Sequence, residues 1–405
     1  MQNLHIPEQI IADRTGESQA KSLFYANGLL ITVTVILLFG LTMLYSTSYN
    51  TAGTKYFYNQ LMWTGVGLAA GGTAFVFGYR RVAEMSLLFA VITVILLAIA
   101  DFCFPAIKGA HRWIQLRKIG LPINIQPSEF AKIVVALYFS RYCAQNTRYI
   151  NDLLKRRGPL PALVICSVVV MFVLVGKDLG TTLLLLMVIG TVLFASGMRM
   201  LFLLPPIIFG VPALIYVISK FDAERWSRMT TFLKPESLAK TEGYQLWNSL
   251  LALGSGKWFG IGFMESRLKA KYLPEAHTDF ILSIVGEELG LISLVMVMLA
   301  YLCFAFFALK ISMNSRTRQG MLLGLALTAI ITLQAIINIG VVSGGIPTKG
   351  MPAPFISYGG SNLLMALIAV GLLLSIAVET ASPGFSDEML ETIKSRIPFL
   401  KRSGK

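Results

Sequence analysis

The chain has 405 residues, of which 55% are hydrophobic and 14% charged, and its mean hydropathy is +0.68. Soluble domains carry about 25% charged residues, so this composition excludes an ordinary soluble protein. The formal net charge of +14 does not by itself indicate nucleic acid, because Lys and Arg in a membrane protein first report orientation, and no nucleic-acid partner is expected.

Long apolar runs recur along the sequence. A membrane-spanning helix needs about 20 such residues, and about ten runs occur, at residues 24–43, 58–78, 87–104, 128–142, 160–176, 179–198, 201–219, 281–309, 321–342 and 362–378. The prediction is an all-α polytopic membrane protein, a bundle of about ten transmembrane helices with one long extracytoplasmic loop between spans 7 and 8. Its expected parts are a cytoplasmic N-terminal segment (1–23), the membrane domain (24–380, with the large outer loop at 220–277) and a basic cytoplasmic tail (381–405).

Basic residues predict the orientation of this bundle. Ten spans place both termini on one side, where the loops and the tail are rich in Lys and Arg, for example Arg80, Arg81, Arg141, Arg148, Arg156, Arg157, Lys310, Arg316, Arg318, Lys401 and Arg402. The positive-inside rule then predicts that both termini are cytoplasmic. The tail is expected to lie against anionic lipid headgroups.

Two segments on the predicted outer side are also basic. Residues 105–127 carry Lys108, Arg112, Arg117 and Lys118, and residues 220–271 carry nine Lys and Arg. Solvated loop charge accounts for most of these residues individually. Two basic loops over one surface nevertheless favour an anionic substrate such as a diphosphate.

The outer segment before the fourth span holds several candidate residues. Arg112 and Trp113 can bind a phosphate and a sugar face, although Trp is also common in the interfacial belt. Glu129 and Lys132 are spaced i, i+3, so they share a helix face within the membrane and can pair, either for helix packing or beside a substrate.

Two features interrupt the next apolar runs. Lys177 and Asp178 divide a stretch that is too long for one span, which predicts an outer hairpin, and whether Asp178 also binds a ligand stays open. Pro205, Pro206 and Pro212 should kink the seventh span.

The segment before the eighth span brings Glu275, His277 and Asp279 within five residues. One interpretation is structural, with Thr278 as the N-cap and Asp279 in the first helical turn, where the helix dipole stabilises its charge. The other makes Asp279 a general base for a hydroxyl nucleophile. Glu287 and Glu288 follow on the same helix, where ionisable groups usually face a cavity or a partner.

The loop at 344–361 is dense in Gly and Pro, which fix turns and allow close backbone approach. It presents Thr348, Lys349, Ser357 and Tyr358 as candidate binding residues. The four cysteines are widely spaced in or near apolar runs, and no phosphate-loop, zinc or nucleotide motif occurs, so no protein metal site is expected.

Together these segments resemble the SEDS family of peptidoglycan glycosyltransferases over residues 24–380. The matching elements are 45–48 (YSTS), 109–113 (GAHRW), 126–130 (QPSEF), 178–181 (DLGT), 273–280 (LPEAHTDF) and 354–361 (PFISYGGS). AHTD at 276–279 and PTKG at 347–350 are closer to members that act in cell division than to those that act in elongation. Many relatives have Pro where this chain has Lys177, which makes a role carried over to Asp178 less secure.

The resemblance implies that lipid II, a diphosphate-linked disaccharide-pentapeptide, is polymerised on the outer face of the bacterial inner membrane, at the division septum. It implies an essential carboxylate at Asp279, with Glu275, His277 and the loop residues near the substrate. It also implies a class B penicillin-binding protein and other division proteins as partners.

The expected reaction is an inverting glycosyl transfer in which Asp279 accepts a hydroxyl proton. Arg112, Lys118 and Lys349 would bind the diphosphate, which a divalent cation such as Mg²⁺ or Mn²⁺ can bridge. Two alternatives are a lipid II flippase with a polar path through Glu129, Lys132, Glu287 and Glu288, and a non-catalytic division scaffold.

Overall fold

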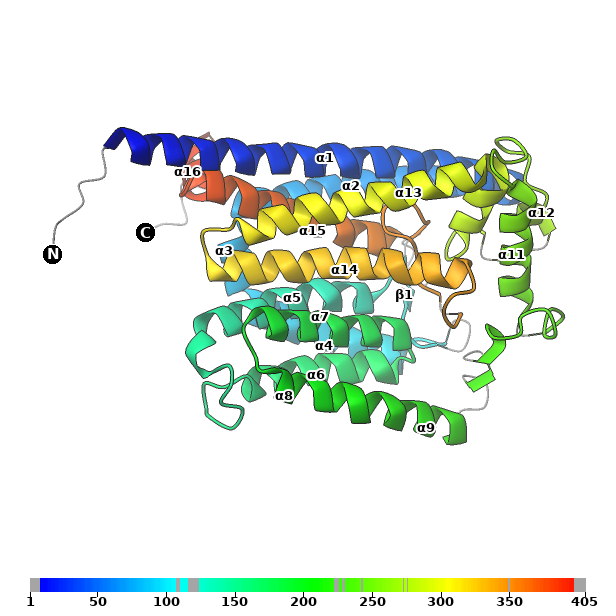
Figure 1. Ribbon diagram of the computed structural model, residues 1–405, viewed down its shortest axis with the longest axis horizontal. Coiled ribbons are helices and arrows are strands. Elements are labelled where there is room, and N and C mark those ends of the chain that lie inside the picture. Colours follow the sequence, from blue (N-terminus) through cyan, green and yellow to red (C-terminus); the bar gives the residue numbers. More distant parts are fainter. Residues whose placement is uncertain are drawn as a thin grey trace.

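The computed structural model describes residues 8–106, 110–115, 124–221, 226–227, 230–241, 243–271, 273–274, 276–348 and 350–396. Within these ranges the regular secondary structure is helical, apart from one short antiparallel pair of strands, β1 (Ile114–Gln115) and β2 (Asn124–Ile125). The long helices run side by side along one direction, and both chain ends lie at the same end of the bundle (Figure 1). The predicted all-α polytopic membrane fold is confirmed.

Each predicted apolar run coincides with a helix or a broken helix, and the bounds agree to within a few residues, except that the helix at Glu8–Ala52 extends well beyond the run 24–43 at both ends. The helices that carry these runs are α1 (Glu8–Ala52), α2 (Lys55–Phe77), α4 (Ser86–Cys103), α5 (Pro127–Gln145), α6 (Leu160–Val175), α7 (Leu179–Ala195), α8 (Met200–Pro205) with η3 (Pro206–Gly210) and α9 (Val211–Phe221), α13 (Ile281–Met313), α14 (Arg318–Val342) and α15 (Gly360–Ala381). The connections hold α3 (Tyr79–Glu84), η2 (Thr147–Tyr149), α11 (Tyr244–Gly256) and α12 (Leu268–Lys271), and α16 (Phe385–Arg396) follows α15.

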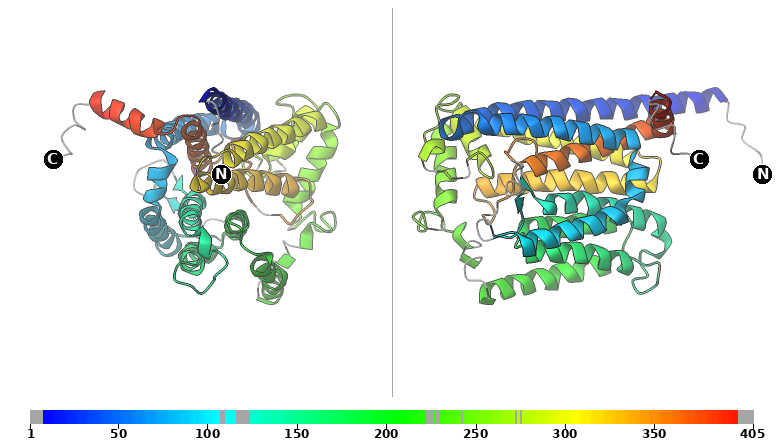
Figure 2. Two further views of the ribbon diagram at one scale, coloured as in Figure 1. Left: turned by 60° about the vertical axis from the view of Figure 1, so that its left-hand side comes forward. Right: turned by 180° about the vertical axis from the view of Figure 1, so that it is seen from behind.

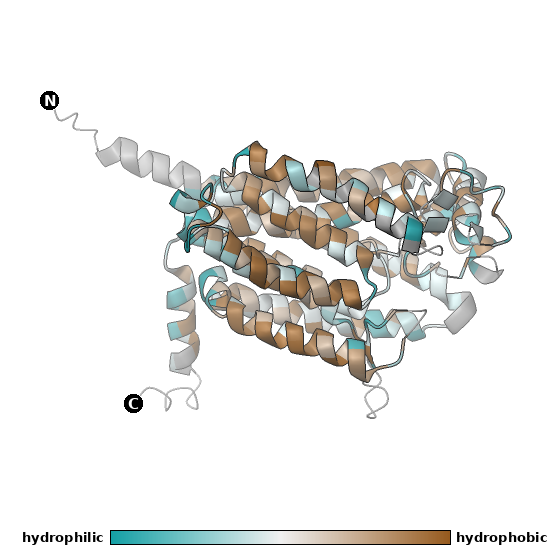
Figure 3. Cartoon of the chain, turned by 90° about the horizontal axis from the view of Figure 1, so that it is seen from below, coloured by the Kyte–Doolittle hydropathy of each residue, from teal (hydrophilic) through white to brown (hydrophobic). Residues whose placement is uncertain are grey.

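Apolar composition and length agree with a membrane location. Among the described residues, five helices are long and apolar enough to cross a membrane, namely α1 over Gln19–Tyr49, α4, α13, α14 and α15, and three shorter apolar helices accompany them. Apolar residues cover these helices, whereas hydrophilic residues gather at the two ends of the bundle (Figure 3). The count of ten spans stays a prediction.

Glycines allow the central helices to pack backbone to backbone. A Cβ at Gly371 of α15 would lie 2.1 Å from the carbonyl oxygen of Gly71 on α2, and a Cβ at Gly71 would lie 2.5 Å from that of Leu367. Small residues of this kind let membrane helices approach closely, because the hydrophobic effect contributes little to helix association inside a bilayer. The α2–α15 pair therefore forms a rigid centre for the loops at its ends.

Two long helices are broken, for different reasons. The seventh apolar run passes from α8 through the π-helical turn η3 into α9 at Pro205 and Pro206, as the proline pattern predicts. Helix α13 is broken at Gly290 (φ 78°), and its carbonyls at 287 and 288 accept hydrogen bonds from the backbone of Ile261 and Gly262. Part of the segment between α9 and α13 is thus held against the break.

Candidate functional site

Asp279 lies in a turn that ends at Phe280, directly before α13, and its side chain is half-buried. The Nδ2 group of Asn338 on α14 donates to the Asp279 carbonyl (2.8 Å) and to the Met351 carbonyl (2.6 Å). A Cβ at Gly350 would lie 2.3 Å from Asp279 Oδ2. The carboxylate therefore lies against the loop between α14 and α15, and one amide ties both segments together.

The structural interpretation of Thr278 as an N-cap is wrong, although the apolar run was correctly predicted to begin at residue 281. Helix α13 begins at Ile281 with Phe280 as its N-cap, no side chain caps it, and no acidic residue lies in its first turn. The residues before it form successive turns, in which the Ala276 amide donates to the Leu273 carbonyl (3.3 Å). Thr278 is therefore not the N-cap, and a place in the first helical turn does not account for Asp279.

An aromatic cluster adjoins this turn. The His277 ring stacks on Tyr56 of α2 with centroids 4.5 Å apart, and Tyr56 lies 4.8 Å from the ring of Tyr358. The Tyr358 amide donates to the His277 carbonyl (2.9 Å). Burial raises the pKa of the Tyr358 hydroxyl, so this group stays neutral. The sequence interpretation included His277 and Tyr358 but missed Tyr56, whose position among several aromatic residues at the start of α2 gave no distinct signal.

The Gly- and Pro-rich loop is held by contacts from three helices. Gln60 of α2 donates to the Ser357 carbonyl (3.1 Å) and accepts from the Gly359 amide (3.3 Å), and the Tyr301 hydroxyl of α13 donates to the Pro354 carbonyl (2.6 Å). Ser357 Oγ accepts from the Ala353 amide (2.8 Å) and is buried, so its contacts shape the loop. Thr348 is half-buried near the other end of the loop.

A buried polar network lies beneath this loop. The Lys132 ammonium is 2.5 Å from a Glu129 oxygen and donates to Gln334 Oε1 (2.8 Å), and Gln334 Nε2 donates to the Pro352 carbonyl (2.8 Å). Asn362 also donates to Glu129 (2.9 Å), and these residues line a small pocket with apolar residues of α14 and α15. The predicted Glu129–Lys132 pair is confirmed, and it supports the loop from α5 and α14.

Asp178 occupies the predicted hairpin between α6 and α7. Its carboxylate caps α7 by accepting from the Thr181 amide (3.3 Å), and it also accepts from the Ser128 hydroxyl (2.9 Å). Arg112 Nη1 lies 3.8 Å from Asp178 Oδ1, while Arg112 Nε is buried and has no hydrogen-bond partner among the residues that the structure describes. Asp178 thus fixes a cation, and Trp113 lies half-buried beside that cation, next to β1.

Gln126 links the two groups of residues. Its side chain donates to Asp178 (3.3 Å), and its backbone amide donates to the Ser361 hydroxyl at the start of α15 (3.1 Å). Arg112, Asp178, the Glu129–Lys132 pair, the loop and Asp279 therefore form one connected region. This region lies toward the end of the bundle opposite the two termini (Figure 1).

Glu287 and Glu288 are engaged by the segment between α9 and α13. The Lys269 ammonium is 2.6 Å from Glu288, both side chains are fully buried, and Ser46 of α1 donates to the other Glu288 oxygen (2.5 Å). Glu287 accepts from the Ser266 hydroxyl. Sequence reasoning counted Lys269 only among the basic loop residues, because no local spacing connects it with Glu288.

Three predicted residues, Lys118, Glu275 and Lys349, lie outside the described residues. Within the part of the chain that the structure describes, no three His, Cys, Asp or Glu residues are placed to hold a metal ion.

Comparison with known proteins identifies the family. The family model described as "Cell cycle protein", which covers FtsW, RodA and SpoVE, matches residues 21–382. The chain belongs to the FtsW/RodA/SpoVE family. The resemblance predicted from the sequence motifs is thereby confirmed.

Two relatives within this family carry the same name, "Probable peptidoglycan glycosyltransferase FtsW". The protein from Trichlorobacter lovleyi is 35% identical over 357 residues, which cover 86% of this chain and 92% of the relative. The protein from Buchnera aphidicola is 38% identical over 295 residues, which cover 71% of this chain and 81% of the relative.

Two solved structures share the fold of this chain. The chain matches a structure titled "Structural coordination of polymerization and crosslinking by a peptidoglycan synthase complex", with a TM-score of 0.74, 23% identity, and coverage of 87% of this chain and 97% of the other. It also matches the Thermus thermophilus rod shape determining protein RodA, with a TM-score of 0.64, 24% identity, and coverage of 87% and 96%. At these identities the match concerns the fold.

Proposed function

We propose that this family member is a peptidoglycan glycosyltransferase that polymerises lipid II in septal wall synthesis. The observation that carries the proposal is Asp279, a half-buried carboxylate placed against a loop fixed by α2, α13 and α14, in the region that also holds Arg112. The names of the relatives indicate the same activity. Both termini would be cytoplasmic, with the region around Asp279 at the outer face of the inner membrane.

The proposed reaction inverts the anomeric centre. The 4-hydroxyl of the acceptor GlcNAc attacks the anomeric carbon of the growing chain and transfers its proton to Asp279. The bond from that carbon to undecaprenyl diphosphate breaks, and the diphosphate leaves with the bonding electrons. Among the cationic side chains that the structure describes in this region, Arg112 is suited to stabilise the negative charge that develops on the diphosphate. Asp178 orients this guanidinium through the 3.8 Å contact.

Asn338 is proposed to position the base. Its two donated bonds hold Asp279 and Met351, and the Cβ of a larger residue at 350 would collide with the carboxylate. A general base must keep its oxygen within about 2.6–3.2 Å of the hydroxyl that it deprotonates. A clamp between two loop segments supplies that constraint without touching the substrate.

If the reaction uses a divalent cation, we propose that the substrate diphosphate carries this cation into the site. Mg²⁺ usually keeps several waters and binds through one or two carboxylates together with substrate phosphates. The acidic residues of this region, Asp178 and Glu129, are already paired with Arg112 and Lys132. These residues therefore fit a cation shared with the substrate better than a cage made by the protein.

A transpeptidase of the class B penicillin-binding type is the proposed partner. The fold is similar to a chain in a peptidoglycan synthase complex whose title joins polymerisation with crosslinking. The remaining division proteins and the septal location are proposed on the basis of the relatives' name.

The flippase alternative is less well supported. A polar path through the bundle would use Glu129, Lys132, Glu287 and Glu288, but Glu129, Lys132 and Glu288 are engaged in buried ion pairs, and Glu287 accepts a hydrogen bond from Ser266. Breaking one buried pair typically costs about 3–5 kcal/mol. The contacts favour a structural role for these residues.

Reconstitution with the transpeptidase partner in liposomes separates the three functions. Fluorescent lipid II is loaded into one leaflet of liposomes that hold the protein in both orientations, and glycan length and lipid redistribution are measured in the same sample. Polymerisation requires long glycan chains sensitive to a muramidase. Redistribution between leaflets without glycan would support a flippase, and neither signal would support a scaffold.

A further inference from the structure

Helix α16 leaves the bundle sideways. It follows α15 after a turn at 382–384, in which Gly384 adopts a left-handed conformation (φ 88°). The helix runs crosswise to the long helices at the end that carries both termini, and its later turns extend beyond the bundle (Figures 2 and 3).

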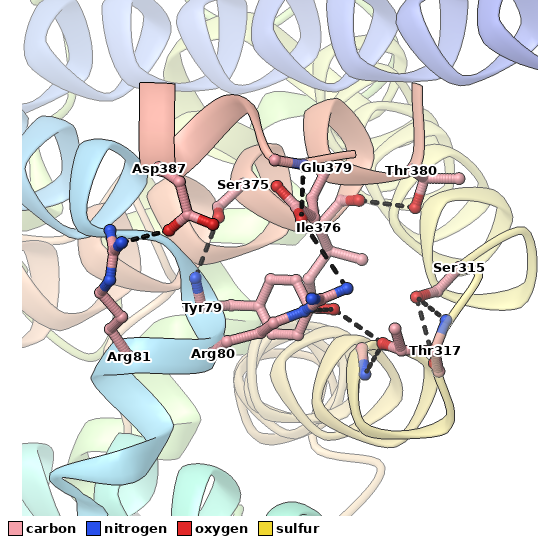
Figure 4. A network of polar contacts seen from close by, with 12 residues as sticks. Tyr79, Arg80, Arg81, Ser315, Thr317, Ser375, Ile376, Glu379, Thr380 and Asp387 are labelled. Atoms are coloured by element: carbon pink, nitrogen blue, oxygen red, sulfur yellow. Dashed lines mark hydrogen bonds and ion pairs between the residues drawn. The ribbon is translucent and has the colours of Figure 1, made fainter. Parts of the chain in front are cut away.

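The first turn of α16 is fixed to α2 and α3. The Phe385 ring lies 5.9 Å from Phe75 on α2, and Arg81 of α3 pairs with Asp387. The polar network next to this junction includes Arg80, which lies 3.7 Å from Glu379 at the end of α15 (Figure 4). The direction in which α16 projects is therefore set by contacts.

The helix has two chemically different faces. Phe385, Met389, Leu390 and Ile393 follow the spacing i, i+4, i+5, i+8, so they share one face, and all four are half-buried. Asp387, Glu388 and Glu391 lie on the opposite face and are exposed. An amphipathic helix that projects beyond its own protein needs an apolar surface to cover its apolar face.

The position of Phe385 shows which way this face is turned. Its partner Phe75 lies two residues before the end of α2, so the apolar face is turned toward the membrane-spanning part of the bundle. The same face of α2 is apolar and exposed farther along the helix, at spacings of seven residues from Phe75, with Leu68 at 57% and Leu61 at 46%. The apolar face of α16 is thus continuous with a surface that faces lipid in a membrane.

We infer that α16 is an interfacial helix that binds the lipid headgroup region of the leaflet at this end of the bundle. Its apolar face would lie about 5–10 Å into the boundary between headgroups and acyl chains. The acidic face would point to water, so a zwitterionic bilayer is sufficient. This inference requires only a membrane-embedded bundle and is independent of the glycosyltransferase proposal.

Depth measurements on the full chain test this inference. Single cysteines at 389, 390 and 393, and matched ones at 388 and 391, would carry an environment-sensitive fluorophore in a variant lacking the native Cys103, Cys143, Cys166 and Cys303. The protein would be reconstituted in phosphatidylcholine vesicles with spin-labelled lipids. We expect blue-shifted emission and lipid quenching at 389, 390 and 393, and quenching by aqueous iodide at 388 and 391.

Two results would overturn the inference. Iodide quenching at all five positions would place α16 in water, and protection from both quenchers at 389, 390 and 393 would mean that protein covers the apolar face. A photoreactive benzoyl-phenylalanine at Leu390 in the otherwise native chain gives an independent readout if the cysteine-free variant does not fold. Crosslinking to lipid is expected there, and crosslinking only to protein would contradict the inference.

Discussion

At the scale of single residues, the proposed site depends on how the side-chain amide of Asn338 and the close approach of Gly350 hold the segment that carries Asp279. Asp279 was predicted from the sequence because Glu275, His277 and Asp279 lie within five residues before an apolar helix. Asn338 was not predicted, because nothing in the sequence around an Asn on an apolar helix indicates that it bonds to residues 59 and 13 positions away. Contacts of this kind arise only from tertiary packing.

Asn338→Asp should lower the polymerisation rate while lipid II binding persists. The introduced Asp carboxylate has nearly the same shape as the Asn338 amide. Its oxygen would face the two carbonyl oxygens that accept hydrogen bonds from Asn338 in the native protein. Leaving buried polar groups unpaired costs about 1–3 kcal/mol, and we expect a fall in kcat of about ten- to a hundredfold with little change in KM. The exposed Asn314 gives the matched control Asn314→Asp at the other end of α13. A normal kcat for Asn338→Asp would refute the clamp.

Two glycines of one loop test the contact with Asp279 directly. A Cβ at Gly350 would lie 2.3 Å from Asp279 Oδ2, whereas a Cβ at Gly345 would meet nothing closer than 3.5 Å. We therefore expect Gly350→Ala to displace the carboxylate and reduce the initial rate, and Gly345→Ala to leave it nearly unchanged. Equal rates for the two variants would mean that the loop does not set the position of Asp279.

At the scale of elements, the features that the sequence predicted depend on residues close together in the chain. The features that it did not predict depend on contacts between residues far apart in the chain. The i, i+3 spacing of Glu129 and Lys132 predicted their ion pair, and the prolines predicted the break after α8. The predicted start of the apolar run at residue 281 agrees with α13, but Thr278 is not its N-cap, because the turns before Ile281 continue past Thr278 and Asp279. The break at Gly290 was not predicted, because it depends on the segment between α9 and α13 that docks there.

The buried Lys269–Glu288 pair should stabilise this docked segment. Lys269→Met leaves Glu288 buried without its cation, and removing one partner of a buried pair typically costs about 3–5 kcal/mol. Thermal unfolding in detergent should show a clear loss for this variant and partial recovery when Glu288→Leu is added. Lys155→Met, which removes an exposed pair with Asp152, should leave the unfolding temperature unchanged. Similar behaviour of both single variants would contradict the assignment.

At the scale of the whole molecule, the residues proposed for chemistry lie toward one end of the bundle and both termini at the other (Figure 1). The apolar periodicity predicted this arrangement because the helices follow the apolar runs closely. Composition alone could not show how the loops meet, since their contacts join α1, α2, α5, α13 and α14. The orientation of the bundle in the membrane is a separate prediction from the distribution of basic residues.

Cysteine labelling in intact cells tests that orientation. Leu154, between α5 and α6, is 90% exposed, and Phe259, in the segment before α13, is 83% exposed. In a cysteine-free background, we expect a membrane-impermeant maleimide to label Phe259→Cys in spheroplasts and to label Leu154→Cys only after lysis. The reverse pattern would place the termini outside and the region around Asp279 in the cytoplasm.

The most direct test of the central claim is lipid II polymerisation by Asp279→Asn, co-purified with its transpeptidase partner. The amide is nearly isosteric but cannot accept the acceptor's proton, and loss of a general base typically lowers the rate about 10²- to 10⁴-fold. Asp152→Asn makes the same change at an exposed position between α5 and α6 and should leave the rate intact. The account predicts loss of glycan product from Asp279→Asn with normal membrane insertion and partner binding. Near-normal product would contradict it.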